Sequence, residues 1–197
     1  MPEHAYCRTV EMSEQHEASA LSERLIHIHQ GECRISEDPR VVLTTMLGSC
    51  VAACLHDPEA RVGGMNHFLL PEAAEAGDRT TLLRYGAHSM ELLVNGLLSI
   101  GARRERLQAK LFGGGQVTDG LTDIGAKNAT FAEHYLAREG IPILGGSLLG
   151  RHARRIQFWP VSGRVRQLAL GITVDAVPIV RPTTSDRAKE HGSVELF

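Results

Sequence analysis

The stretch TTMLGSCVAACLHDPEARVGGMNHFLLPE, from Thr44 to Glu72, decides how the middle of this chain folds. Its run CVAACLH is short, apolar and bounded by turn signals, which is typical of a buried strand. The residues 57–60 that follow, DPEA, form a turn signal with proline at the second position. RVGGMNHFLL then predicts another strand, which ends at Pro71 because proline cannot donate to a ladder. The stretch therefore predicts a β-hairpin.

The elements around this hairpin predict an α+β fold. A β-branched run over 40–46 predicts a strand before it, and apolar residues at helical spacing predict a helix over 79–100. Further elements follow in the order strand at 107–115, helix ending near 139, then strands in IPILGG, RRIQFWPV and RQLALGIT. Because this order is not a strict βαβ alternation, it favours layered mixed or antiparallel sheets with helices outside, in a single domain over 23–180. A polar N-terminal extension (1–22) and a flexible C-terminal tail (181–197) are expected to flank it.

Composition restricts the class of function. The 197 residues carry a net charge of −2 and are 5% aromatic, which argues against nucleic-acid binding. No apolar run approaches the roughly 20 residues of a membrane span, and no signal peptide is apparent. We therefore expect a cytoplasmic protein without membrane insertion, in which the four cysteines (Cys7, Cys33, Cys50 and Cys54) stay reduced.

Cysteines and histidines in the hairpin allow three interpretations: a metal site, a nucleophile with its base, or an ordinary buried hairpin. The metal ligands would be Cys50, Cys54, His56 and His67. Four residues of strand span about 13 Å, whereas two sulfurs on one zinc each lie about 2.3 Å from it. This spacing disfavours a metal, and we expect no metal or organic cofactor.

The nucleophile hypothesis depends on the register of the hairpin. If the turn is centred on 57–60, Cys50 lies directly opposite His67, with Cβ atoms about 5 Å apart. An imidazolium there would lower the thiol pKa, and the same histidine could protonate a leaving amine. The amides of Gly48, Ser49 and Cys50 could face a developing oxyanion. A hydroxyl of the preceding threonine pair, 44–45, could orient the imidazole.

The stretch LTTMLGSCVAACLHDPEARVGGMNHFLLP resembles the signature region of the chemoreceptor glutamine deamidase family, CheD. Three later segments are similar to that family in the same order: YGAHSMELLVNGLLSIGARRERLQAKLFGGG, IGAKNATFAEHYLAREGIPI and RRIQFWPVSGRV. The resemblance covers about 40–175. It implies an α/β/β/α layered fold and deamidation of glutamine side chains on methyl-accepting chemoreceptors in chemotaxis adaptation.

By position, the resemblance implies a nucleophilic Cys50, a catalytic His67 and Thr44, rather than Thr45, as the orienting threonine. The mechanism it implies passes through a cysteine thioester. From motif order we expect Phe112 and the glycines 113–115, including Gly113 and Gly114, to line the mouth of the site.

Other parts of the resemblance concern partners. Some family members bind a CheC-type phosphatase, so a receptor- or phosphatase-binding module with little turnover is one alternative function. A thiol-dependent receptor methylesterase is another. The chain departs from the family pattern in the loop at 147–153, where Ser147, Leu149 and Ala153 replace an acidic residue and glycines. A leucine in place of glycine at 149 points to a changed local backbone.

Overall fold

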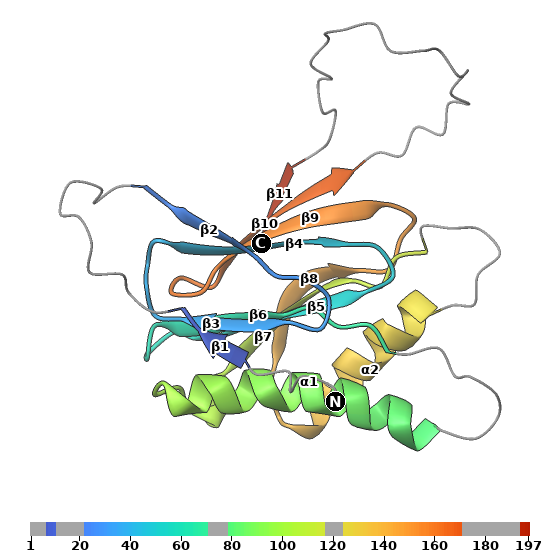
Figure 1. Ribbon diagram of the computed structural model, residues 1–197, viewed down its shortest axis with the longest axis horizontal. Coiled ribbons are helices and arrows are strands. Elements are labelled where there is room, and N and C mark those ends of the chain that lie inside the picture. Colours follow the sequence, from blue (N-terminus) through green and yellow to red (C-terminus); the bar gives the residue numbers. More distant parts are fainter. Residues whose placement is uncertain (1–6, 11–21, 71–78, 117–123, 171–193) are drawn as a thin grey trace, which may run out of the picture.

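Two β-sheets pack face to face in the computed structural model, which describes residues 7–10, 22–70, 79–116, 124–170 and 194–197 (Figure 1). Sheet A has the strand order β1 (Cys7–Thr9), β3 (Cys33–Ser36), β6 (Val62–Asn66), β5 (Val51–Asp57), β7 (Gln108–Gly113) and β8 (Ile143–Leu148). Sheet B has the order β11 (Val194–Leu196), β10 (Arg164–Leu170), β9 (Ala153–Trp159), β4 (Val41–Leu47) and β2 (Arg24–His27). Each sheet contains parallel and antiparallel pairs, so the predicted α+β class with mixed sheets is confirmed.

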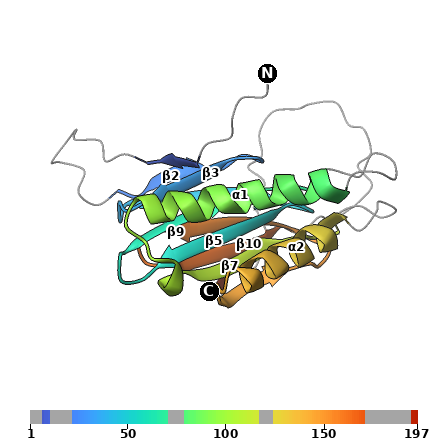
Figure 2. The same cartoon turned by 90° about the horizontal axis from the view of Figure 1, so that it is seen from below.

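Both described α-helices, α1 (Arg79–Ser99) and α2 (Ile124–Arg138), cover the outer face of sheet A (Figure 2). The burial of β5 explains this arrangement. Val51, Ala53 and Leu55 pack toward the helices, whereas Ala52 and Cys54 pack toward sheet B. The outer face of sheet B carries no helix among the described residues, so the observed layers are α/β/β rather than the expected α/β/β/α.

The ends of the described chain belong to the sheets. Strand β1 pairs with β3, although 1–22 was expected to be an extension. Strand β11 pairs with β10, and the ring of Phe197 packs against Phe112, whereas a flexible tail was expected over 181–197. Residues 1–6, 11–21 and 181–193 of those predictions lie outside the described residues.

Two cysteines that were expected to be free form a disulfide. Cys7 and Cys33 lie directly opposite each other in the parallel β1–β3 pair, and their sulfurs are bonded. The prediction missed this because neither β1 nor β3 was recognised, so nothing placed the two residues side by side. Cys50 and Cys54 are the free cysteines of the described chain.

The β5–β6 hairpin exists, but its register differs from the predicted one. The observed pairs are Asp57 with Val62, His56 with Gly63 and Cys54 with Met65. Four residues rather than two make the turn, because the Asp57 carboxylate accepts the N–H groups that follow it and Arg61 closes the turn at a φ of 56°. The strands are therefore offset by two residues, and Cys50 does not lie directly opposite His67.

Candidate active site

Cys50 and His67 share one face of sheet A despite the changed register. The bridge between Val51 and Phe68 continues the β5–β6 pairing beyond the strands. An offset of two residues leaves the alternation of side chains unchanged, so both functional side chains still point toward sheet B. Their relation is diagonal rather than opposed, and diagonal positions lie about 7 Å apart. No hydrogen bond joins the two side chains in the described part of the chain.

The contacts of His67 define which of its nitrogens is free. Its Nδ1 lies 2.8 Å from Oγ1 of Thr45 and 3.4 Å from the carbonyl oxygen of Ile28. Thr45 donates its own hydroxyl hydrogen to that same carbonyl, at 2.7 Å. Since the hydroxyl hydrogen is used there, Oγ1 must accept from His67, and the ring carries its hydrogen on Nδ1. The opposite nitrogen, Nε2, is buried and has no hydrogen-bond partner among the described residues.

The structure places Thr45, not Thr44, against His67, which corrects the expectation from the resemblance. Thr44 donates its hydroxyl to the carbonyl of Ile156 at 2.7 Å. The reason is the alternation of β4. Leu43 and Leu47 point into the space between the sheets, so Thr45 does too, whereas Thr44 points away. This alternation was visible in RVVLTTML and would have indicated that Thr45, rather than Thr44, points between the sheets.

Both site groups favour their neutral forms at rest. Burial lowers the pKa of His67, an effect that His29 reinforces and the Ile28 carbonyl partly offsets. Burial also raises the pKa of the half-buried Cys50 thiol, although its own backbone amide acts in the opposite direction. Burial of both groups therefore opposes the thiolate–imidazolium pair that was expected.

Backbone hydrogen bonds hold the loop Gly48–Cys50 from behind. Gly115 donates its N–H to the carbonyl of Gly48 at 2.8 Å, and Gly114 donates to the carbonyl of Cys50 at 2.7 Å. Gly113 and Gly114 have φ values of 108° and 66°, which glycine adopts without strain. No described residue accepts a hydrogen bond from the N–H of Gly48 or Ser49.

Asn128, on α2, completes this support and was not singled out from the sequence. It is fully buried and donates from Nδ2 to the carbonyl of Ser49 at 2.8 Å. Its Oδ1 accepts the N–H of Leu70 at 2.8 Å. One side chain thus ties the loop before Cys50 to the segment after His67. The I-G-x-x-N motif that carries it was the available signal.

Phe112 does not line an open mouth. Its side chain is fully buried between the sheets and makes an edge contact with Phe197. Gly113 and Gly114 lie behind the loop of Cys50 rather than at its exposed side. The expectation that these three residues line the site is therefore wrong for Phe112, while the glycines act through the backbone.

The loop at 147–153 keeps a glycine-like backbone conformation at Leu149, so the changed backbone expected there is not seen at this residue. Leu149 has a φ of 66°, in the region that favours glycine, and its side chain is 47% exposed. Arg154 holds the loop by donating to the carbonyls of Ser147, at 2.6 Å, and of Leu149. The N–H of Leu149 reaches the carbonyl of Gly113 at 2.8 Å, so this loop adjoins the glycine turn behind Cys50.

A glutamine that the sequence analysis did not consider contacts the thiol. Cys50 lies 3.6 Å from Oε1 of Gln30 and donates to it. The turn that carries Gln30 is fastened to His67, since Gly31 donates its N–H to the carbonyl of His67 at 2.7 Å. The N–H of His67 in turn reaches the carbonyl of Glu32 at 3.0 Å. No sequence signal connected this turn to the hairpin, because the strand β3 that follows it was missed.

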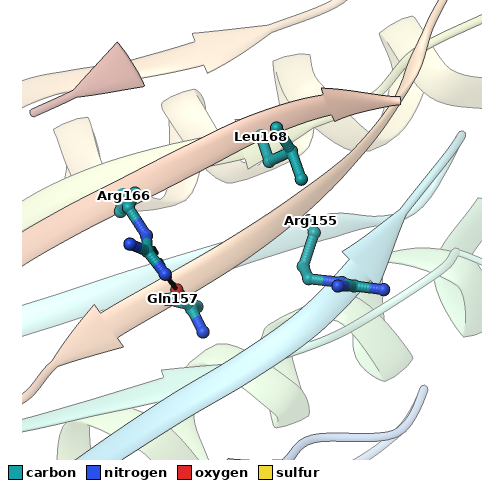
Figure 3. Close-up of a pocket in the computed structure, with 4 residues that line it drawn as sticks. All are labelled: Arg155, Gln157, Arg166 and Leu168. Carbon is teal, nitrogen blue, oxygen red and sulfur yellow. Dashed lines mark hydrogen bonds between the residues drawn. The ribbon is translucent and has the colours of Figure 1, made fainter. Parts of the chain in front are cut away.

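Other features of the described chain lie apart from this site. A hollow of about 190 Å³ on the outer face of sheet B is lined by Arg155, Gln157, Arg166 and Leu168 (Figure 3). Within it, Arg166 donates from Nε to Gln157 at 2.9 Å. The described residues contain no group of three or more histidine, cysteine or acidic side chains placed to hold a metal. None of the described helices is long and apolar enough to cross a membrane.

Comparison with known proteins identifies the family. The family model described as CheD chemotactic sensory transduction matches residues 69–168. A relative from Caulobacter sp. (strain K31) is 54% identical over 173 residues, which is 87% of this chain and 92% of the relative. The chain belongs to the CheD family.

Two further CheD relatives are similar over most of their length. One, from Acidiphilium cryptum, is 58% identical and covers 88% of this chain and 94% of its own. The other, from Rhizobium johnstonii, is 56% identical and covers 88% and 96%. All three relatives carry the name "Probable chemoreceptor glutamine deamidase CheD". The resemblance drawn from the sequence motifs is thereby confirmed at the level of the family.

Proposed function

We propose that this protein deamidates glutamine side chains of methyl-accepting chemoreceptors, with Cys50 as the nucleophile. The names of its relatives support the substrate and the reaction. One observation supports the chemistry above all others: His67 presents a buried, unpartnered Nε2 on the face that carries a half-exposed thiol. Buried polar atoms are normally paired, so an unpaired one indicates a role in binding or catalysis.

The neutral resting pair favours general-base attack over a preformed ion pair. His67 accepts the thiol proton on Nε2 while Sγ of Cys50 bonds to the Cδ of the substrate glutamine. The negative oxygen that forms is stabilised by the N–H groups of the loop Gly48–Cys50, whose carbonyls are tied back by the glycine turn. His67 then returns the proton to the departing ammonia, leaving a thioester.

Hydrolysis of the thioester completes the cycle. His67, again neutral, takes a proton from water, and the hydroxide attacks the thioester carbonyl. Cys50 leaves and regains a proton, and the substrate carries glutamate. Thr45 keeps the ring in the tautomer that this sequence needs, because it accepts from Nδ1 and leaves Nε2 free. Every step uses protein groups and water.

The test is peptide mass spectrometry of a purified chemoreceptor cytoplasmic fragment after incubation with this protein. The expected result is a gain of about 1 Da at particular glutamines with the wild type and with Cys54→Ala, but not with Cys50→Ala. Cys54 is a matched control, because it is a free cysteine on β5, four residues after Cys50, and is fully buried. Deamidation that survives Cys50→Ala would refute the proposal.

A CheC-type phosphatase remains a proposed second partner, which the family resemblance implies. Its binding is independent of turnover, so Cys50→Ala should bind it as the wild type does. Titration calorimetry with both proteins measures this directly. No heat of binding with either protein would remove the phosphatase from the list of partners.

A further inference from the structure

The contact between Cys50 and Gln30 places a carboxamide of this chain against the nucleophile of a proposed glutamine deamidase. The thiol donates to Oε1 of Gln30 at 3.6 Å. A glutamine substrate would present the same group, at the same distance from its backbone, to the same sulfur. The side chain of Gln30 thus has the chemistry of the substrate that the site is proposed to accept.

The position of Gln30 is built into the fold rather than set by a loose terminus. Its turn is closed by a bond from the N–H of Glu32 to the carbonyl of His29 at 3.0 Å. Glu32 also accepts the N–H of His29 through its carboxylate, at 3.0 Å. Two backbone bonds then join this turn to His67, through Gly31 and Glu32. Gln30 is therefore carried by the segment that also positions the catalytic imidazole.

The pose of Gln30 differs from that of a reacting substrate. In attack, the carbonyl oxygen must receive hydrogen bonds from the N–H groups of the loop Gly48–Cys50. Here Oε1 of Gln30 instead receives the hydrogen of the thiol. The contact occupies the sulfur without polarising the amide for attack.

We propose that Gln30 is an internal occupant of the subsite that receives the substrate carboxamide, and that it must swing out before a receptor glutamine can enter. This inference rests on the proposed function. Gln30 is exposed, so its side chain can leave the thiol without disturbing the core. The apparent affinity for substrate equals the intrinsic affinity multiplied by the fraction of molecules in which Gln30 has left the thiol.

Two measurements on Gln30→Ala test this. The first is the rate of alkylation of Cys50 by iodoacetamide, followed by peptide mass spectrometry, which needs no receptor. The second is KM and kcat for deamidation of the receptor fragment. We expect about fivefold faster alkylation and a KM lower by a similar factor, with the effect confined to KM. Gln108→Ala, on β7 opposite His56, is the control and should match the wild type in both.

The outcomes separate this inference from the proposed function. Equal alkylation rates and equal KM values in Gln30→Ala and Gln108→Ala would overturn the inference while deamidation itself stands. Faster alkylation of Gln30→Ala, with no deamidation by any variant, would support the occupied subsite and refute the deamidase. The mass of the peptide containing Gln30 should stay unchanged during turnover. A gain of about 1 Da there, absent in Cys50→Ala, would make Gln30 a substrate rather than an unreactive occupant.

Discussion

The two ends of β5 differ in how their polar groups are satisfied. At one end, the fully buried Asp57 accepts the N–H groups of Glu59 and Ala60 on Oδ1, and its Oδ2 accepts from Arg103 and Arg106. At the other end, the buried Nε2 of His67 has no partner in the described chain. Satisfied groups stabilise a fold, whereas an unsatisfied one costs stability and is retained where it acts. The Asp57 end is therefore fully hydrogen-bonded, whereas the His67 end keeps a buried nitrogen unpaired, as the proposed general base requires.

The two free cysteines, Cys50 just before β5 and Cys54 within it, show the same contrast. Cys54 is fully buried, and burial raises the pKa of its thiol far above the ordinary value, with Lys110 offsetting this only in part. Cys50 is half-buried, and its pKa is raised less strongly by the same cause. The two side chains are chemically identical, so solvent access and the neighbouring imidazole distinguish the proposed nucleophile from the core residue.

The largest expected effect is on catalysis at the Cys50 end. Cys50→Ala should lower the deamidation rate on the order of 10⁴-fold or more, because the covalent route is lost. Cys54→Ala should keep the rate and lower the free energy of unfolding by about 1 kcal/mol, through the small cavity it leaves. Initial rates and urea unfolding of both variants measure this. Equal rate losses in the two variants would end the distinction between the two thiols.

Two histidines provide the next test: His56 lies near the end of β5, and His67 lies beside its start. His67→Ala should lower kcat by about 10²–10⁴-fold, the range for losing a general acid–base group. His56, whose Nδ1 lies 2.8 Å from the carbonyl of Pro160, should tolerate replacement by alanine with kcat unchanged. Steady-state kinetics of His67→Ala and His56→Ala measure this difference in kcat. A comparable kcat for His67→Ala and the wild type would contradict the assigned base.

Removing the carboxylate at the structural end should affect stability alone. Asp57→Ala should lower the free energy of unfolding at pH 7 by about 3 kcal/mol, because it breaks a buried ion pair and leaves N–H groups unpaired. Burial by itself raises the pKa of Asp57, but N–H donors from Ala60, Arg103 and Glu59 and the Arg106 guanidinium outweigh it, so the pKa lies below its ordinary value.

The sign of the pH dependence follows from that lowered pKa. The carboxylate contributes stability above its unfolded pKa and loses it as pH falls through the lower, folded pKa. The deficit of Asp57→Ala should therefore be full at pH 7 and shrink in strong acid, as measured by urea unfolding at several pH values. A loss of unfolding free energy in Asp57→Ala that grows on acidification would contradict this sign. A changed kcat would contradict a purely structural role for Asp57.

The adjacent threonines of β4 give a smaller effect. Thr45→Val should lower kcat by about tenfold, because His67 loses the acceptor that fixes its tautomer. Thr44→Val has the same change of shape and should leave kcat unaltered, with a stability loss of about 1 kcal/mol from its lost bond to Ile156. Comparison of kcat between the two variants is the measurement. A lower kcat for Thr44→Val, with kcat of Thr45→Val unchanged, would restore Thr44 as the orienting residue.

The smallest effect concerns the loop beside the glycine turn. Leu149→Gly should raise the free energy of unfolding by about 1 kcal/mol, because glycine adopts its positive φ without steric cost. Thermal or urea unfolding measures this. A destabilised Leu149→Gly would show that the exposed leucine makes compensating contacts.

Much of the fold was predictable because local patterns carry it. The runs at β4–β7 and β9–β10, and both helices, follow from period and turn signals in the sequence. Strands β1, β2 and β3 are three or four residues long, too short to give a period, and the Cys7–Cys33 pair was missed with them. The register of the hairpin failed for a specific reason: Asp57 closes a longer turn with its side chain, which the turn signal alone does not encode.

The placement of the two main candidate residues was predictable, and that of their supporting contacts was not. Spacing put Cys50 and His67 on one face of the sheet, and an error of two residues in register left them on that face. Thr45 was passed over although strand alternation favoured it. Asn128 and Gln30 come from distant segments, and their contacts depend on tertiary packing that one sequence does not reveal.

Trapping the acyl intermediate would show whether Cys50 carries a thioester during turnover. The receptor fragment and the protein are incubated with hydroxylamine, which attacks a thioester in competition with water. If Cys50 forms the intermediate, the modified glutamines should partly appear as hydroxamates, about 16 Da above glutamine, alongside glutamate about 1 Da above it. Both products should be absent with Cys50→Ala. Glutamate without hydroxamate at saturating hydroxylamine, or either product with Cys50→Ala, would contradict a thioester on Cys50.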